Sequence, residues 1–447
     1  MAFHLPRSIV LAPQDNTKYL SYFREGGDTD GFLKFFETQA VSPYATFDVE
    51  TSCKKVLVHI RSRQSNKYWE RIKKVSDTAE YWVAATAENK EDDQSKESWT
   101  LFKFIPAEGG AKTVHIVHFQ SGCNLCLWEG SDPALDRCVS AKFREYDGRD
   151  NDIFKIIDCK SLLVLPKYVA LKGFNNMYLG IEGNEVAYSA DDLGNPDVAW
   201  ATVFQMKEPC ASNPLELITF GGLSRRGESS LFSLENNKFC SKTKGSSSGI
   251  WYGPNAETIN KEARLTLKEP VLSVDIYDVT YHLHNSRVYD QTTFMVAKNY
   301  ASNYTDEQAH TDVKITYENV TTSVWKRNFS ASLRLEAKTE FNIPFVADRG
   351  VELSAEFHDE TKTRKPVTDV VHKVIVPAMT KVTVNLIATR AKCDVPFSFM
   401  QSATLYDGTI SISEVEGAVY AGSNYYSIHF ETEHEKLMPK PKKTELW

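Results

Sequence analysis

Residues 328–343 have the sequence NFSASLRLEAKTEFNI, in which apolar and polar side chains alternate. A period of two predicts an extended strand with one apolar and one polar face. The run is also long, because ordinary strands have about 5–6 residues. The apolar residues all carry odd numbers: Phe329, Ala331, Leu333, Leu335, Ala337, Phe341 and Ile343.

The odd-numbered pattern resumes in residues 351–357, after the segment PFVADRG at 344–350. Pro344 and Gly350 favour a turn there, so we predict a hairpin. A transmembrane β-strand needs about 9–11 residues with one apolar and one polar face. A half-solvated antiparallel strand pair has the same pattern. These residues alone leave both interpretations open.

The composition describes an ordinary globular chain. Its 447 residues allow two to four domains, and 42% hydrophobic with 25% charged residues exclude wholesale disorder. Aromatic residues make up 12%, which suits β-rich folds and sugar-binding surfaces. The net charge of -7 argues against nucleic acid as a partner.

The N-terminal residues predict no targeting segment. Pro6 and Pro13 interrupt the first twenty residues, so we expect no signal peptide, and no apolar run of about 18 residues predicts a transmembrane helix. We therefore expect a cytoplasmic or nucleocytoplasmic protein with conditional membrane association. The eight cysteines are expected to be free, buried thiols of a reducing compartment.

Internal repeats predict the domain organisation. An Asn followed closely by an aromatic residue recurs in NTKYLSY (16–22), SNKYWERI (65–72), NLCLWEG (124–130), FNNMYLGI (174–181) and ENNKFCSK (235–242). A second apolar element follows each, at Phe47, Phe102, 152–157, Phe204 and Leu265. Three units of 40 to 50 residues are what a β-trefoil requires.

We therefore predict an all-β chain of four parts. Residues 1–158 form a β-trefoil, and 159–270 form a second, shortened trefoil module with two clear units. Residues 271–432 form an elongated antiparallel β-domain of long alternating strands, and 433–447 form a charged tail.

Two family resemblances agree with this division. KKVLVHIRSRQSNKYW (54–69), AEYWVAATAENKEDDQSKESWTLFKFI (79–105) and DCKSLLVLPKYVALKGFNNMYLGI (158–181) resemble the amaranthin-like plant agglutinins, over about residues 5–268. EPVLSVDIYDVTYHLHNSRVY (269–289), the segment 323–357 and VPAMTKVTVNLIATRAKCDVPFSF (376–399) resemble the aerolysin-type pore-forming module. The resemblance implies a chimeric lectin of plant defence or stress response.

The agglutinin resemblance implies sugar-binding residues. Glu80, Tyr81 and Trp82 match the family's Tyr-Trp sugar-contacting loop, and Asn66 and Lys67 lie in the preceding turn. The second module offers Trp251 and Tyr252. For any one of these aromatic residues taken alone, packing in the core of a trefoil is the favoured interpretation. The implied ligand is a glycan containing galactose or N-acetylgalactosamine, such as the T-antigen.

The aerolysin resemblance favours the membrane interpretation of the hairpin at about 329–357. A lone hairpin leaves backbone groups unpaired in hydrocarbon, so insertion requires a homo-oligomeric barrel. The polar face would line the lumen. The residues predicted to meet lipid or the tip are Phe329, Leu333, Leu335, Phe341, Ile343, Phe345, Val346, Val351, Leu353 and Phe357.

No motif indicates catalysis, a cofactor or a metal. GSSSG (245–249) lies in a Ser-rich loop rather than a nucleophile elbow, and CNLC (123–126) has no second pair. Two alternatives to a pore-forming lectin remain. One is a glycan-cross-linking lectin whose aerolysin-like domain only oligomerises, and the other is a carbohydrate-active enzyme with trefoils as binding modules.

Overall fold

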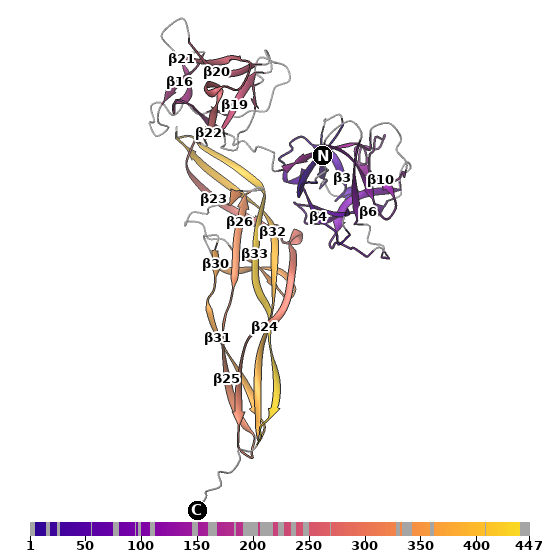
Figure 1. Ribbon diagram of the computed structural model, residues 1–447, viewed down its shortest axis with the longest axis vertical. Coiled ribbons are helices and arrows are strands. Elements are labelled where there is room, and N and C mark those ends of the chain that lie inside the picture. The colour runs from indigo at the N-terminus through magenta and orange to yellow at the C-terminus, as the bar shows by residue number, and fades with distance from the viewer. Residues whose placement is uncertain are drawn as a thin grey trace, which may run out of the picture. The chain divides into compact units, whose positions relative to one another are not determined.

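The computed structural model is built from antiparallel strands, and the only helical turns among the residues it describes are short 3-10 segments (Figure 1). These are η1 (Gly27–Thr29), η2 (Pro43–Ala45), η5 (Lys261–Ala263) and η6 (Leu283–Asn285). The all-β prediction is therefore confirmed. The structure describes residues 5–14, 18–24, 27–54, 56–74, 80–93, 95–96, 100–107, 112–144, 151–159, 168–182, 185–190, 204–205, 218–221, 228–233, 238–244, 250–268, 270–327, 331–332, 342–357, 362–406 and 408–438.

Six strands of the N-terminal part close into a ring. β1 pairs with β4, β4 with β5, β5 with β8, β8 with β9, β9 with β13, and β13 with β1. Their bounds are β1 (Ser8–Pro13), β4 (Phe47–Thr51), β5 (Val58–Ser62), β8 (Phe102–Pro106), β9 (Thr113–His118) and β13 (Phe154–Asp158). Closure leaves this barrel without an open edge.

Three further strand pairs, one per repeat, complete the N-terminal part. β2 pairs with β3, β6 with β7, and β11 with β12, while β10 pairs with β9. Their bounds are β2 (Tyr19–Tyr22), β3 (Leu33–Glu37), β6 (Tyr68–Lys73), β7 (Tyr81–Ala87), β10 (Cys123–Asn124), β11 (Cys126–Leu127) and β12 (Val139–Ser140). A six-stranded ring with three added pairs is the β-trefoil that the repeats predicted.

The repeated aromatic residues form the barrel core. Phe47, Phe102 and Phe154 begin the fourth strand of each repeat and are buried. The Trp69 ring packs edge-on against Phe47 and Phe102, with centroid distances of 4.9 and 5.8 Å. No repeat could bury these rings alone, so the core requires all three.

The second module contains two sets of four strands. β14 to β17 form the first set and β19 to β22 the second, while β18 pairs with β19. The bounds are β14 (Tyr168–Gly173), β15 (Tyr178–Glu182), β16 (Glu185–Ala190), β17 (Phe204–Gln205), β18 (Ile218–Gly221), β19 (Glu228–Ser233), β20 (Lys238–Lys244), β21 (Ile250–Ala256) and β22 (Leu265–Lys268). Leu171, Leu179 and Leu265 lie in its core.

The C-terminal part contains the longest strands of the described chain. β32 (Thr380–Leu405) has 26 residues and β33 (Ile410–Lys436) has 27, which at about 3.3 Å per residue spans roughly 85–90 Å. The main sheet has the order β23-β32-β33-β26-β27, with β24 on β32 and β30 on β26. The other bounds are β23 (Val271–Tyr281), β24 (Arg287–Asn303), β25 (Ala309–Glu318), β26 (Thr321–Arg327), β27 (Ala331–Ser332), β28 (Asn342–Ala347), β29 (Gly350–Phe357), β30 (Lys362–Arg364) and β31 (Val367–Val376).

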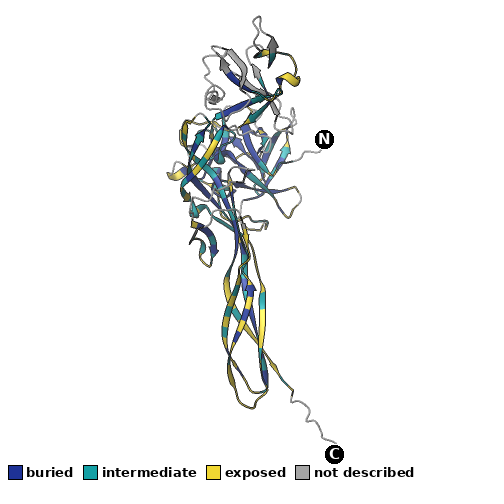
Figure 2. Ribbon diagram, turned by 90° about the vertical axis from the view of Figure 1, so that its left-hand side faces the viewer, coloured by how far each residue is buried: buried dark blue, intermediate teal, exposed yellow. Residues whose placement is uncertain are grey.

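A two-stranded ribbon of β25 and β31 packs against the long sheet. Alternate residues of the ribbon and of β32 point inward and form one core: Val313, Ile315, Tyr317, Val374, Val376, Val382, Val384 and Leu386. The outward residues are mostly exposed, and Figure 2 shows exposed and buried residues interspersed along these strands. The elongated β-domain is thus a thin sandwich stabilised by a period-two pattern.

The chain divides into two compact units. Residues 1–162, 278–399 and 415–447 form one unit, and residues 163–277 with 400–414 form the other. The N-terminal barrel and most of the elongated domain thus share one unit. No helix among the described residues is both long and apolar enough to cross a bilayer.

Candidate functional sites

The predicted Tyr-Trp sugar loop is largely structural. Trp82 is fully buried between Phe32 and Trp128, and its indole N–H donates to the Lys74 carbonyl at 3.2 Å. A sugar therefore has no access to either face of this ring. The prediction that Trp82 contacts sugar is wrong for this structure, because the alternation of β7 turns Trp82 inward.

The two neighbours of Trp82 are more accessible. Glu80 is exposed and Tyr81 is half-buried. The Arg71 guanidinium lies 3.5 Å from the centroid of the Tyr81 ring and occupies one of its faces. At most one face of Tyr81 is therefore available for stacking on a sugar.

The aromatic pair of the second module is only partly described. Tyr252 is buried in the core of that module, and its hydroxyl donates to the Ala263 carbonyl at 3.3 Å. Its predicted contact with sugar is wrong for the same reason as that of Trp82. The side chain of Trp251 lies outside the described residues.

Asn66 is committed to a contact with the elongated domain. Its backbone has a φ of 56°, the left-handed conformation that Asn tolerates well. Its Oδ1 accepts from Arg61, and its Nδ2 donates to the carbonyl of Asn285 at 2.7 Å. Asn66 is only 6% exposed. It therefore fastens the trefoil to η6, just before β24, and its amide is not available to a sugar.

An ionic cluster surrounds this contact. The buried Arg61 donates to Asp48 at 2.7 Å and to Glu50 at 3.3 Å. Arg287, at the start of β24, donates to Glu50 at 3.0 Å. Tyr68 donates to the same carboxylate at 3.0 Å. Glu50 thus joins a cation of the trefoil to a cation of the elongated domain.

These charges shift the pKa values of their neighbours. Burial alone would raise the pKa of Glu50, but Arg287 and Arg61 outweigh it, so this pKa is lowered. Burial and the Glu50 carboxylate raise the pKa of Tyr68 to about 12. Burial raises the pKa of Asp394, which accepts a hydrogen bond from Tyr289 at 3.2 Å. The cluster therefore favours an ionised Glu50 and neutral tyrosines.

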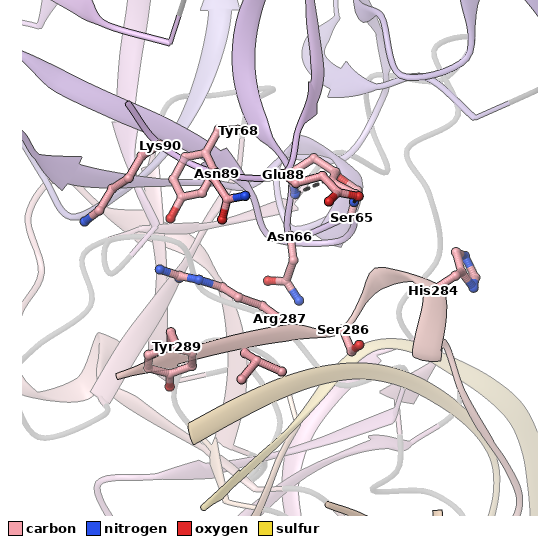
Figure 3. Close-up of a pocket in the computed structure, with 12 residues that line it drawn as sticks. Ser65, Asn66, Tyr68, Glu88, Asn89, Lys90, His284, Ser286, Arg287 and Tyr289 are labelled. Atoms are coloured by element: carbon pink, nitrogen blue, oxygen red, sulfur yellow. Dashed lines mark hydrogen bonds and ion pairs between the residues drawn. The ribbon is translucent and has the colours of Figure 1, made fainter. Parts of the chain in front are cut away.

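A polar cavity of about 390 Å³ lies beside the cluster, and we call it the cluster pocket. Figure 3 shows Asn66 pointing from the trefoil toward the strand that carries Ser286 and Arg287. Its lining residues are Ser65, Asn66, Lys67, Tyr68, Glu88, Asn89, Lys90, His284, Ser286, Arg287, Val288 and Tyr289. Asn66 and Lys67, both predicted to bind sugar, thus border this cavity, and Lys67 pairs with Glu88 at 2.9 Å.

A second contact joins the trefoil to β33. Gly417 has a φ of 75°, and a Cβ atom there would overlap the ring of Pro43. Only glycine fits both this backbone and this approach. Arg24 and Glu416 form an ion pair at 3.7 Å alongside.

The predicted hairpin is present as β28 and β29, with a two-residue turn at Asp348 and Arg349. Val346 lies opposite Val351 and Pro344 opposite Leu353, whereas Phe345 lies opposite Glu352. Opposite residues share a face, so the odd-numbered residues of the two strands point to different faces. The sequence predicted one apolar face made of the odd-numbered residues of both strands, and the described part of this hairpin has no such face. The reason is the two-residue turn, which pairs each odd-numbered residue with an even-numbered one.

The turn lies later than the sequence predicted. Pro344, Phe345 and Val346 belong to β28 rather than to the tip, and Ile343 and Val346 are buried. Val351 is half-buried and Leu353 is 40% exposed. Phe329, Leu333, Leu335 and Phe341 lie outside the described residues, as does the side chain of Phe357.

One side chain of the long sheet anchors the hairpin. The Val346 N–H donates to Oδ1 of Asn424 at 2.8 Å, and Nδ2 of Asn424 donates back to the Val346 carbonyl at 2.8 Å. Asn424 lies on β33 and is only 9% exposed. β28 and β29 form no ladder with any other described strand. Asn424 therefore replaces the backbone pairing that a permanent member of the sheet would have.

The seat of the hairpin is incompletely packed. A cavity of about 270 Å³ lies between β28, β29 and the strands β26 and β33, and its walls include Ile343, Ser354 and Asn424. Asn319 borders it, and the buried side-chain oxygen of Asn319 has no hydrogen-bond partner among the described residues. A seat with a void and an unpaired polar atom holds its occupant less firmly than a filled core does.

Sequence reasoning missed Arg61, Glu50, Arg287 and Asn424. Arg287 and Glu50 lie 237 positions apart, and Asn424 lies 78 positions from Val346. No local spacing marks such pairs. The charged residues Glu50 and Arg61 within strand sequence were the available signal, because charged side chains in a buried strand need partners.

These features define the class of protein. The described chain combines an N-terminal β-trefoil with an elongated antiparallel β-domain that carries a separate hairpin. Family models place the two parts: the agglutinin domain model matches residues 3–158, and the aerolysin toxin model matches residues 258–411. The chain therefore combines a region that matches the agglutinin domain family with a region that matches the aerolysin toxin family.

Solved structures give weaker likenesses. A lamprey immune protein is 13% identical, with 60% of this chain and 91% of that chain covered and a TM-score of 0.31. The parasporin-2 toxin of Bacillus thuringiensis is 19% identical over 36% and 73%, with a TM-score of 0.20. The Rhizoctonia solani agglutinin is 16% identical over 35% and 99%, with a TM-score of 0.27. A search of curated proteins finds no significant match.

Proposed function

We propose that this chain binds glycans through its agglutinin domain and permeabilises membranes with the hairpin segment at about 329–357. The agglutinin and aerolysin matches support the two halves of this proposal. The observation that carries it is the hairpin β28–β29, which lies over a cavity and is fastened by Asn424 rather than by pairing with another described strand.

The proposed sequence of events begins at a surface. The agglutinin domain binds a glycan containing galactose or N-acetylgalactosamine and concentrates the protein there, where several copies together gain avidity. The copies assemble and the hairpin leaves its seat. Hairpins from neighbouring copies then pair into a closed barrel, because unpaired backbone groups are too costly in hydrocarbon.

The register of the hairpin adds a requirement. In the barrel, all apolar odd-numbered residues of both strands would face lipid, including Leu333 and Leu353. The present pairing places odd opposite even residues. Insertion therefore requires β28 and β29 to shift by one residue relative to each other. A hairpin that has left its seat can make this shift, whereas a hairpin held in register by a neighbouring strand cannot.

The proposed physiological role is defence or stress response in a plant cell, from a cytoplasmic or nucleocytoplasmic location. We propose no catalytic role for any residue. A lectin that only cross-links glycans, with the aerolysin-type domain as an oligomerisation scaffold, is the second candidate. The long packed sandwich of β25, β31 and β32 suits such a scaffold.

Dye leakage from vesicles tests the proposal. The vesicles carry a glycolipid that ends in galactose linked to N-acetylgalactosamine. Wild-type protein should release the dye, and Leu333→Asp with Leu335→Asp should abolish release without affecting glycan binding. The matched control is Ser330→Asp with Ser332→Asp, which places the same charges on the polar face and should leave release unchanged. Vesicles that stay sealed at every protein concentration would refute the pore.

A further inference from the structure

The cluster pocket contains polar groups that the protein leaves unused. The Asn89 side-chain amide and the Ser286 hydroxyl form no hydrogen bond with any described residue, and Arg287 bonds Glu50 through Nη1 alone. These groups come from two domains and line one cavity. Polar donors that converge on a cavity without internal partners are typical of a ligand site.

The volume and chemistry of the pocket match a sugar ring. At about 390 Å³ the cavity lies within the range of small-molecule pockets. Its walls supply hydroxyl, amide and carboxylate groups, from Ser65, Ser286, Asn89 and Glu88. Such groups bond the hydroxyls of a saccharide, and Figure 3 shows them around one opening.

The charge of the pocket is cationic. Lys67, Lys90 and Arg287 line it, against the single carboxylate of Glu88 among its described lining residues. Glu50, just outside the lining, is shared among Arg61, Arg287 and Lys90. Asp48 in turn faces both Arg61 and Arg63. Asp394 also interacts electrostatically with Arg61 and Arg287. The cations Arg61, Arg63, Lys67, Lys90 and Arg287 still outnumber the carboxylates Asp48, Glu50, Glu88 and Asp394, which leaves room for one anionic group from a ligand.

Arg287 is positioned to receive that group. Its guanidinium lies 4.8 Å from the centroid of the Tyr289 ring and 5.7 Å from that of Tyr68. The two rings and Glu50 hold the planar guanidinium in place. A guanidinium held this way binds a carboxylate or sulfate through two parallel hydrogen bonds.

We propose that the cluster pocket is a binding site for an acidic saccharide, in which Arg287 and Lys90 bind the carboxylate or sulfate and Asn89, Ser286 and Glu88 bind hydroxyls. This proposal rests on glycan binding by the chain and assigns a second specificity to it. The aerolysin-type domain supplies Ser286 and Arg287, so the site requires both domains. A free sugar acid and the acidic end of a glycolipid share this chemistry.

Calorimetric titration of the full chain with matched sugar pairs tests the proposal. The pairs are 3′-sialyllactose with lactose, methyl glucuronide with methyl glucoside, and 6-sulfo-galactose with galactose. At least one acidic sugar should bind tenfold or more tightly than its neutral partner. Asn89→Ala and Arg287→Gln should each reduce that difference at least fivefold. Lys96→Gln, an exposed lysine of the same domain paired with Glu91, should leave it unchanged.

The outcomes separate this site from the proposed function. Equal binding of acidic and neutral sugars by the wild type, in solution and on glycolipid vesicles alike, overturns the pocket as a site for acidic saccharides. Wild-type selectivity in both pocket variants overturns it as well. If inorganic sulfate binds as tightly as the acidic sugars, the pocket is a general anion site, and the proposal that its ligand is a saccharide is refuted. Asn89 is an exposed loop residue, so the Asn89→Ala variant should fold, and an unchanged denaturation midpoint checks this.

The proposed function is tested separately, by vesicle leakage and by binding of the neutral glycolipid in the same Asn89→Ala variant. Acidic-glycolipid vesicles that bind while the soluble sugar does not identify the membrane as the ligand's source.

Discussion

The agglutinin core and the seat of the hairpin are both built from strands, but they hold their occupants differently. In the core, Trp69 is fully buried against Phe47 and Phe102, inside a closed ring of paired strands. At the seat, the hairpin has no ladder to any described strand of the sheet, a polar anchor in Asn424 and a void of about 270 Å³ beneath it. The difference separates a closed, fully packed core from a hairpin held by few contacts, as the proposed release of the hairpin requires.

The largest expected effect is a break of the core. Trp69→Ala removes a fully buried indole and should cost about 3–5 kcal/mol of the free energy of unfolding. Trp69→Phe is the control, because the buried Trp69 indole N–H has no hydrogen-bond partner to lose among the described residues. Urea denaturation followed by fluorescence measures both. Equal, small losses in the two variants would show that the core is as loosely held as the seat.

The next effect concerns the anchor of the hairpin. Asn424→Ala removes both hydrogen bonds to Val346 and should weaken docking by about 1–3 kcal/mol. Amide exchange in β28 and β29 should then accelerate by roughly five- to 150-fold, since about 1.4 kcal/mol is a factor of ten. Exchange in the trefoil should stay unchanged.

Asn385→Ala is the matched control for Asn424→Ala. Asn385 is also a buried asparagine of the long sheet, but it donates to Glu433 rather than to the hairpin. Its loss should leave exchange in β28 and β29 at the wild-type rate. The same acceleration in both variants would mean that the whole sheet loosens and that Asn424 has no special role.

The smallest effect is a pH dependence at the ionic cluster. The pKa of Glu50 is lowered in the folded state, so its stabilising contribution is complete above the unfolded value of about 4.3 and is lost as pH falls through the folded value. Amide exchange at the start of β24 should therefore accelerate below about pH 4.3. Glu50→Gln should exchange faster at neutral pH and lose its share of the acid response. An unchanged acid response in this variant would exclude Glu50 as its source.

The sequence predicted the folds better than the sites. Repeated aromatic residues such as Phe47 and Phe102 predicted the trefoil, because each repeat must bury its ring against the others. Alternation predicted the long strands and the hairpin. Alternation also placed Trp82 correctly in a strand but could not tell which face pointed inward. Cys53, expected to be buried, is exposed because it lies in the connection between β4 and β5.

The sites depend on pairs distant in sequence. Asn66 was predicted to bind sugar, yet it bonds the backbone of Asn285, whose approach depends on how two domains pack. The length of the turn decides which residues of β28 and β29 share a face. A turn one residue longer or shorter reverses the face of every side chain in one strand. Composition and periodicity do not determine either quantity.

A reversible tether on the hairpin tests the central claim most directly. Val346→Cys with Asn424→Cys places two thiols at the contact between β28 and β33, for an engineered disulfide. Mass spectrometry confirms the cross-link, and oxidised wild-type protein is the control for the exposed Cys53. Oxidised variant should bind glycolipid vesicles without releasing dye, and reduction should restore release. Equal release from the cross-linked and reduced forms would contradict an account in which the hairpin leaves its seat to enter the membrane.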